Sequence, residues 1–217
     1  ERLQRMIRPF ILRRLKGDVL KDLPEKIEEN VFARLDGEQM QLYDAYATRM
    51  KEMLSQQNEK EFHKGRMQIL SELTKLRQLC CDPGLLLEDY HGESAKTDMC
   101  MELIVNAVGA GHKISQFTSM LDRLTERLKK EGIDYYLLTG SVNKEKRMQM
   151  VESFNNDDVP VFCISLKAGG TGLNLTSADI VIHYDPWWNV AAQNQATDRA
   201  HRIGQKNTVT VYRLIAK

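Results

Sequence analysis

Three closely spaced glycines, Gly169, Gly170 and Gly172, give the segment 165–175 a backbone that a ligand can approach closely. Glycine has no Cβ atom and reaches backbone conformations closed to other residues, which suits a loop whose N–H groups cradle a phosphate. The segment fits neither common nucleotide-binding pattern, because it lacks the third glycine of a Gly-x-Gly-x-x-Gly turn and the chain contains no Gly-Lys-Ser/Thr. Taken alone, the loop is compatible with a phosphate site and with a structural turn.

Two arginines near the C-terminus, Arg199 and Arg202, have the spacing of neighbours on one face of a helix, and Gln195 lies one turn before Arg199. Two guanidinium groups that point the same way from a helix can hold a polyphosphate through paired hydrogen bonds. We expect a helix over 190–202 to present this face. The alternative is a solvated face, or one that forms a salt bridge with Asp198.

Two adjacent tryptophans, Trp187 and Trp188, follow a predicted strand. Neighbouring side chains in a loop cannot both enter one core easily, so one indole is available to stack on, or wedge into, a nucleic acid. Packing of the loop against its own domain is the alternative.

Other common catalytic arrangements are missing from the sequence. His183 and His201 have no Ser or Cys at the spacing of a nucleophile and its base, and the four cysteines form no Cys-x-x-Cys pair. We therefore expect no metal site in this chain. We interpret the cysteines as reduced thiols of an intracellular protein, cytoplasmic (nucleoid) in a bacterium and nuclear in a eukaryote.

Alternating strands and helices are predicted to position these loops. Short apolar runs predict strands over 135–138, 161–165, 180–184 and 209–214, and helical spacing predicts helices near 99–108, 121–130, 144–154 and 190–202. Runs that are apolar on both faces are typical of a parallel sheet covered by helices on both sides. Residues from about 95 onward are therefore predicted to form a doubly wound α/β domain, which binds ligands at the carboxyl ends of its strands.

A different pattern precedes this domain. From 38 to 81 apolar residues recur at helical spacing, with a polar break at 55–58, which predicts two antiparallel helices. We expect their apolar stripes to pack on each other, and a groove for a partner is the alternative.

The charge of the chain is balanced overall and uneven along it. Lys and Arg number 31 against 30 Asp and Glu, a net charge of +1 that by itself gives no sign of a nucleic-acid partner. Basic residues outnumber acidic ones by eight to four over 1–26 and by five to one over 191–217, whereas acidic residues lead by eight to four over 27–63. The apolar runs are far shorter than the roughly 18 residues that span a bilayer, so no membrane segment is predicted.

Taken in order, the glycine loop, the tryptophan pair and the arginine pair resemble the second RecA-like lobe of a Swi/Snf-family ATP-dependent DNA translocase, within helicase superfamily two. Segment 165–175 resembles motif V, and 185–189 followed by 195–205 resembles the motif VI region. Segment 115–118 resembles motif IV, and 138–141 resembles the backbone-contacting turn after the next strand. Segment 76–83 resembles the approach to the lobe, and 7–26 resembles the basic segment that joins the two lobes. The likeness is weakest over 38–66, where the family carries a helical protrusion.

This resemblance implies a mechanism in which ATP binds between two lobes. The first lobe supplies the phosphate-binding lysine and the acid that coordinates Mg²⁺, and the second supplies arginine fingers that stabilise the charge on the γ-phosphoryl group. By resemblance, Arg199 and Arg202 are these fingers, Gln195 lines the same pocket, and Gly170 and Gly172 shape its wall.

The resemblance also implies double-stranded DNA as a partner, gripped along one strand. The residues that would hold its phosphates on this lobe are Ser115, Gln116, Thr139, Gly140 and Lys167. Trp188 would reach the DNA as a wedge.

The sequence departs from the family pattern in three places. The phosphate-binding lysine and the Asp-Glu-x-His box of a first lobe are absent, so this chain alone is expected not to hydrolyse ATP. Val190 occupies a position where the family usually has proline. Before Ser115 only Ile114 remains of an apolar strand, so either the strand runs from about His112 through Phe117 or residues are missing from the sequence.

The leading hypothesis is therefore the second motor lobe of a translocase that remodels protein–DNA complexes, together with a first RecA-like lobe of the same protein. The expected organisation is a basic lobe-joining segment over 1–37, a helical protrusion over 38–94 and the RecA-like lobe over 95–217. The alternative is a degenerate lobe that binds DNA or a protein without contributing to turnover. An ordinary dinucleotide-binding protein would need the glycine turn that the chain lacks.

Overall fold

A computed structural model of the chain describes residues 23–56, 59–118, 120–165, 168, 173–186 and 189–217, together with Met6 and Phe10. Gly170, Gly172, Lys167 and Trp188 lie outside the described residues, as do the side chains of 59–64, 117 and 118. None of the described helices is long and apolar enough to cross a membrane.

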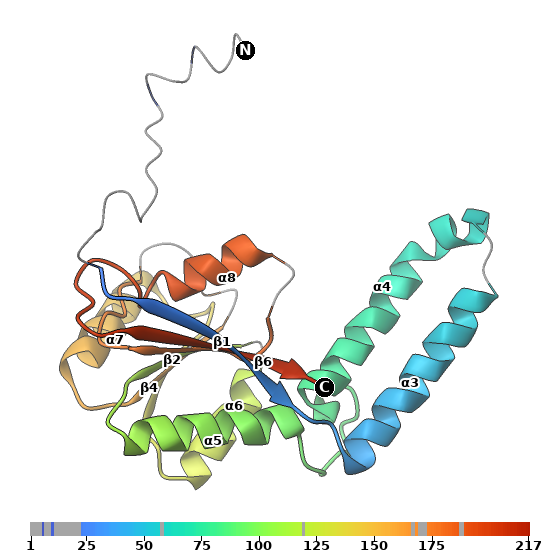
Figure 1. Cartoon of the computed structure of the whole chain (residues 1–217), viewed down its shortest axis with the longest axis horizontal. Helices are drawn as coiled ribbons and strands as arrows, with labels where there is room; N and C mark the ends of the chain where they lie inside the picture. The colour runs from blue at the N-terminus through green and yellow to red at the C-terminus, as the bar shows by residue number, and fades with distance from the viewer. Residues whose placement is uncertain are drawn as a thin grey trace.

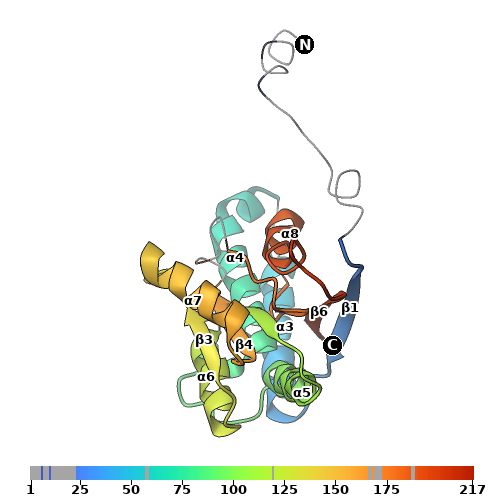
Figure 2. The ribbon, with the colours of Figure 1, turned by 90° about the vertical axis from the view of Figure 1, so that its left-hand side faces the viewer.

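The core of the molecule is one six-stranded sheet in which all strand pairs are parallel. Its strand order is β1-β6-β5-β2-β4-β3, so that β1 and β3 form the two edges (Figure 2). The strands are β1 (Lys26–Ala33), β2 (Ile114–Thr118), β3 (Tyr135–Leu138), β4 (Val161–Ser165), β5 (Ile180–His183) and β6 (Val209–Ala216). The apolar runs of β4 and β5 are almost entirely buried, as expected of inner strands covered on both faces.

Two layers of helices cover the sheet, with α8 on one side and α5 on the other (Figure 1). Buried residues of α5 and α6 pack with one face of the strands, and those of α7 and of the α8 region pack with the other. The helices of the lobe are α5 (Ala95–Gly109), α6 (Leu121–Lys130), α7 (Lys144–Asn156) and α8 (Val190–Thr197). The predicted doubly wound α/β fold is confirmed.

The predicted helical protrusion is present as a pair of long helices that extend away from the sheet (Figure 1). They are α3 (Gly37–Ser55) and α4 (Glu59–Cys81), and the short helix η2 (Pro83–Leu85) follows them. Leu70 and Leu73 on α4 remain 56% and 37% exposed, so the apolar stripes are only partly covered.

Buried hydrogen bonds join this protrusion to the lobe. Gln39 on α3 donates to the carbonyl of Leu79 (2.8 Å) and accepts from the N–H of Ala95 at the start of α5 (3.0 Å). The Tyr184 hydroxyl, which follows β5, donates to the carbonyl of Cys81 at the end of α4 (2.7 Å). Because these groups are buried, the bonds fix how α4 enters the lobe.

Strand β1 lies in the range 1–37, which was expected only to join two lobes. It pairs with β6 along its whole length, so the sheet starts before the protrusion and continues after it. Most of its side chains are exposed, as is common in edge strands, and Glu28 binds both Lys26 and Arg213. The hydrogen bond from Lys26, followed by that from Arg213, lowers the pKa of Glu28 despite partial burial.

Strand β2 occupies the centre of the sheet and contains Ser115 and Gln116. It runs from Ile114 to Thr118, close to the expected strand from about His112 through Phe117. Ser115 and Gln116 are both fully buried, and Gln116 lies between Cys163 and Ile182 on the neighbouring strands. Within the described part of the chain, neither side chain has a hydrogen-bond partner. As placed, they cannot reach a DNA backbone, contrary to expectation.

We expect Gln116→Leu to stabilise the chain. A buried amide without partners costs about 1–3 kcal/mol of desolvation, and leucine fills a similar volume without polar atoms. Urea denaturation should show a free energy of unfolding that is higher by about that amount. The control, Gln149→Leu at an exposed position of α7, should change it by no more than about 0.5 kcal/mol. A loss of stability in Gln116→Leu alone would contradict the placement of β2.

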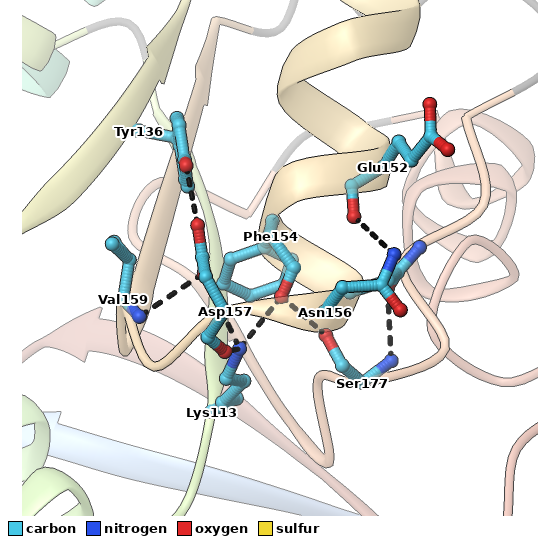
Figure 3. A network of polar contacts seen from close by, with 9 residues as sticks. Lys113, Tyr136, Glu152, Phe154, Asn156, Asp157, Val159 and Ser177 are labelled. Atoms are coloured by element: carbon cyan, nitrogen blue, oxygen red, sulfur yellow. Dashed lines mark hydrogen bonds and ion pairs between the residues drawn. The ribbon is translucent and has the colours of Figure 1, made fainter.

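A partly buried lysine ties the end of α7 to the amino ends of the inner strands (Figure 3). Lys113 Nζ donates to the carbonyls of Phe154 (2.6 Å) and Asp157, and lies 4.8 Å from the centre of the Phe154 ring. The Asp157 carboxylate accepts hydrogen bonds from the Tyr136 hydroxyl and from the Val159 N–H. These contacts of Lys113 anchor the end of α7 at the amino ends of the strands. The loops that were expected to bind ligands lie at the opposite, carboxyl ends.

Candidate functional site

The predicted helix over 190–202 is shorter than expected. Helix α8 begins at Val190, where the Asn189 side chain accepts from the N–H of Ala192 (3.2 Å), and ends at Thr197. Beyond it, the Arg199 N–H bonds to the carbonyl three residues back, which tightens the chain into a turn. The Thr197 hydroxyl lies 2.9 Å from His183 Nε2 on β5, which fixes the end of the helix. Arg199 and Arg202 therefore do not share one helical face.

Arg199 points inward from this turn. Only 6% of its surface is exposed, and burial, followed by the charge of Arg147, lowers the pKa of its guanidinium to about 10. Its backbone carbonyl accepts from the N–H of Leu175 (2.9 Å). Arg199 thus lies between the turn, helix α7 and the segment that follows the glycines.

Arg202 points outward. The residue is exposed, and its Nη1 donates to the carbonyl of Leu173 (3.1 Å), which directly follows the glycine loop. Gln195 is exposed on α8. The structure therefore brings the arginine turn and the end of the glycine loop together, as the order of the motifs suggests.

This contact is not at the carboxyl ends of the strands, where ligands were expected. The segment 173–178 leads into the amino end of β5 and packs under the turn, with Gly204 close to Thr176. Gly204 has φ +101°, a conformation that favours glycine, and it turns the chain back toward β6. Gly204 lies well beyond Thr197, the last residue of α8.

A cavity of about 770 Å³ is lined in part by Leu173, whose carbonyl accepts from Arg202. It lies between α7 and the residues Leu173 and Asn174, and the charged side chains that line it are Lys144, Arg147 and Glu152. Asn155 donates to the carbonyl of Asn174 (2.7 Å) and so holds its two walls together. The two cations against one carboxylate favour an anionic group near this wall.

Arg147 was missed by the sequence analysis. It shares one face of α7 with Val151 and with the buried Phe154, at spacings of four and three residues. That spacing predicts that Arg147 faces the core side of α7. It does not predict that Arg199, which follows α8, lies near it.

The carboxyl ends of the strands carry a second group of candidate residues. Thr139 and Gly140 directly follow β3, and the Thr139 and Ser141 hydroxyls lie 2.8 Å apart. Asn143 then caps α7 by accepting from the Lys146 N–H (2.9 Å). Gly140 is exposed and Thr139 is half-buried, so both are accessible to a phosphate backbone.

The chain that leads to the tryptophans is held firmly. Asp185 Oδ2 lies 2.6 Å from Arg77 Nη2 on α4, and the Tyr184 hydroxyl lies 2.9 Å from that of Thr97 on α5. Burial lowers the pKa of His183, which precedes them, to about 4, so its imidazole is neutral near pH 7. Contacts with the protrusion and with the lobe therefore both fix the start of this loop.

Metal ligands are not gathered anywhere in the described residues, where no group of three His, Cys, Asp or Glu side chains could hold an ion. Burial raises the pKa of the Cys81 and Cys100 thiols to about 12, so these cysteines are unreactive packed thiols.

Comparison with known proteins identifies the class of this lobe. Residues 95–204 match the helicase conserved C-terminal domain, which agrees with the doubly wound parallel sheet. Residues 1–85 match the SNF2-related domain. The chain belongs to the Snf2 family and is a helicase C-terminal, RecA-like lobe.

Relatives and solved structures agree with this assignment. A protein of Mycoplasma pneumoniae described as an ATP-dependent helicase is 43% identical over 96% of this chain, and the chain spans only 20% of that relative. The Sulfolobus solfataricus SWI2/SNF2 ATPase core in complex with dsDNA is similar with a TM-score of 0.75 and 37% identity, covering 99% of this chain and 46% of that one. The C-terminal domain of the Sulfolobus ATPase gives a TM-score of 0.69 and 33% identity, covering 88% of this chain and 80% of that one.

Proposed function

We propose that this chain is the second motor lobe of an ATP-dependent translocase that moves along double-stranded DNA and remodels protein–DNA complexes. The observation that carries the proposal is the contact of Arg202 with the carbonyl of Leu173, which joins the arginine turn to the end of the glycine loop. In the family that this chain belongs to, ATP lies between such a lobe and a first RecA-like lobe.

Arg199 and Arg202 are the proposed arginine fingers. Their guanidinium groups would stabilise the charge that develops on the γ-phosphoryl group as the first lobe closes over ATP. Gln195, Gly170 and Gly172 would complete this wall of the pocket. Residues of the first lobe would hold most of the Mg²⁺ coordination.

The two arginines have different surroundings, which suggests different tasks. Arg202 is already at the surface and needs only to exchange its bond to the Leu173 carbonyl for a phosphate oxygen. Arg199 is buried beside Arg147, so its charge acts in a poorly solvated environment where electrostatic interactions are stronger.

The proposed DNA-binding surface lies at the carboxyl ends of the strands. Thr139 and Gly140 belong to it by position, and Lys167 and Trp188 by resemblance. Ser115 and Gln116 do not belong to it because both are buried within β2. The division that we propose is a joining segment (1–37), a protrusion (38–94) and a lobe (95–217). Strand β1 of the joining segment is part of the sheet of the lobe.

A degenerate lobe that binds DNA or protein without turnover is the second candidate. The polar residues buried in β2 favour it, because they weaken the centre of the sheet. If the lobe is an active motor, the buried polar residues of β2 must not displace Arg199 and Arg202. Either protein would act inside the cell, in the cytoplasm or in the nucleus.

Salt dependence tests the DNA partner. Binding of duplex DNA by the full-length protein should weaken steeply with salt, and Lys167→Ala should reduce the slope of log K against log salt by about one. The control is Lys129→Ala, which removes an exposed cation at the end of α6. A response to salt that is flat, or equal slopes in both variants and the parent, would count against this surface and favour a protein partner.

A further inference from the structure

Gln205 is a buried glutamine, 7% exposed, whose side chain bonds only to backbone groups. Its Nε2 donates to the carbonyls of Ala178 (2.8 Å) and Ala200 (3.1 Å), and its Oε1 accepts from the N–H groups of Lys206 and Asn207 (2.9 Å each). Both hydrogens and both lone pairs of the amide are therefore used.

These bonds connect three separate segments of the chain. Ala200 lies in the turn between the two arginines, and Ala178 ends the segment that leads from the glycine loop to β5. Lys206 and Asn207 begin the return to β6. The amide of Gln205 thus sets the position of the arginine turn against the glycine-loop segment.

Two further bonds link the same parts. The Leu175 N–H donates to the carbonyl of Arg199, and Arg202 donates to the carbonyl of Leu173. Both of these involve the arginines themselves, whereas Gln205 bonds only to backbone groups and to neither guanidinium group. A shift of this turn would move both guanidinium groups together.

We propose that Gln205 is a positioning residue that fixes Arg199 and Arg202 for ATP hydrolysis. This inference rests on the proposed function of the two arginines. A fully satisfied buried amide is a stiff connection, because any displacement leaves polar groups unpaired in a poorly solvated place. Its expected contribution is to kcat, because displaced fingers impair the transition state more than the binding of ATP.

The test is Gln205→Met in the full-length protein, which keeps the size of the side chain and removes its four hydrogen bonds. The matched control is Gln39→Met, because Gln39 is also a buried glutamine bonded to backbone groups but lies at the junction of α3 and α5. Both variants should lower the urea midpoint. Only Gln205→Met should lower kcat, by about 10²-fold as expected for small misplacements, with KM for ATP nearly unchanged.

A double variant separates positioning from general damage. If Gln205 acts through the fingers, Gln205→Met should reduce the residual single-turnover rate of Arg202→Ala by less than it reduces the parental rate, because only Arg199 remains to be displaced. Independent effects would multiply in full. Loss of kcat to the same extent in both glutamine variants, or full multiplication in the double variant, would overturn the inference. Unchanged activity of Arg202→Ala by itself would instead overturn the proposed function.

A second variant keeps the test open if Gln205→Met unfolds. Gln205→Glu retains the acceptor oxygens but loses the donors to Ala178 and Ala200, and protonation at low pH restores one donor. Its kcat relative to the parent should therefore rise as the pH falls. A ratio that does not change with pH would contradict the positioning role.

Discussion

Arg202→Ala is expected to abolish DNA-stimulated ATP hydrolysis by the full-length protein. Arginine fingers contribute roughly 10³–10⁵-fold to the rate of phosphoryl transfer, because their charge meets charge that develops only in the transition state. Arg202 is exposed, and in the described structure its side chain bonds only to the backbone carbonyl of Leu173, so its removal should not disturb the core. Steady-state kinetics with saturating duplex DNA should show the loss in kcat.

The control for this loss is Lys206→Ala, which removes an exposed cation from the same segment but has no proposed role in the ATP pocket. It should retain nearly the parental kcat. Equal activity of Arg202→Ala and the parent would remove Arg202 from the active site, whereas equal losses in both variants would indicate a general effect of charge.

Lys113→Met, outside the proposed site, is expected to lower the stability of the chain. It removes the donor to the carbonyls of Phe154 and Asp157 and leaves the Asp157 carboxylate without its cation (Figure 3). Hydrogen bonds that involve a charged group contribute about 1.5–3 kcal/mol, and these are part-buried. Thermal or urea unfolding of the chain should show a fall of that size.

Lys51→Met on the exposed side of α3 is the control, and it should change the free energy of unfolding by no more than about 0.5 kcal/mol. Because α7 also carries Arg147, Lys113→Met should weaken the packing near Arg199 as well. If Lys113→Met were as stable as the control, the network at the end of α7 would not hold this helix.

Much of the fold is predictable because inner parallel strands are apolar on both faces. The runs of β4 and β5 are unambiguous, and the helices between the strands follow from their spacing. Strand β1 is not predictable in this way, because an edge strand needs few buried residues and Glu28 and Glu29 make it resemble a solvated linker. Strand β2 is difficult for the opposite reason, since its polar Gln116 occupies a central position.

The candidate site was predictable in its residue types more than in its geometry. The spacing of Arg199 and Arg202 suggested one helical face, whereas the chain leaves the helix at Thr197 and sends the two side chains in different directions. That difference depends on tertiary bonds, such as those of Gln205 to Ala178 and Ala200, which no local pattern indicates.

The most direct test of the proposed motor function is ATP turnover by the full-length protein, measured with and without duplex DNA. We predict hydrolysis that rises on addition of duplex DNA and returns to its basal rate when DNA binding is suppressed by salt. An absence of ATP turnover, or a rate that duplex DNA does not change, would contradict a DNA-dependent motor and favour a lobe that only binds.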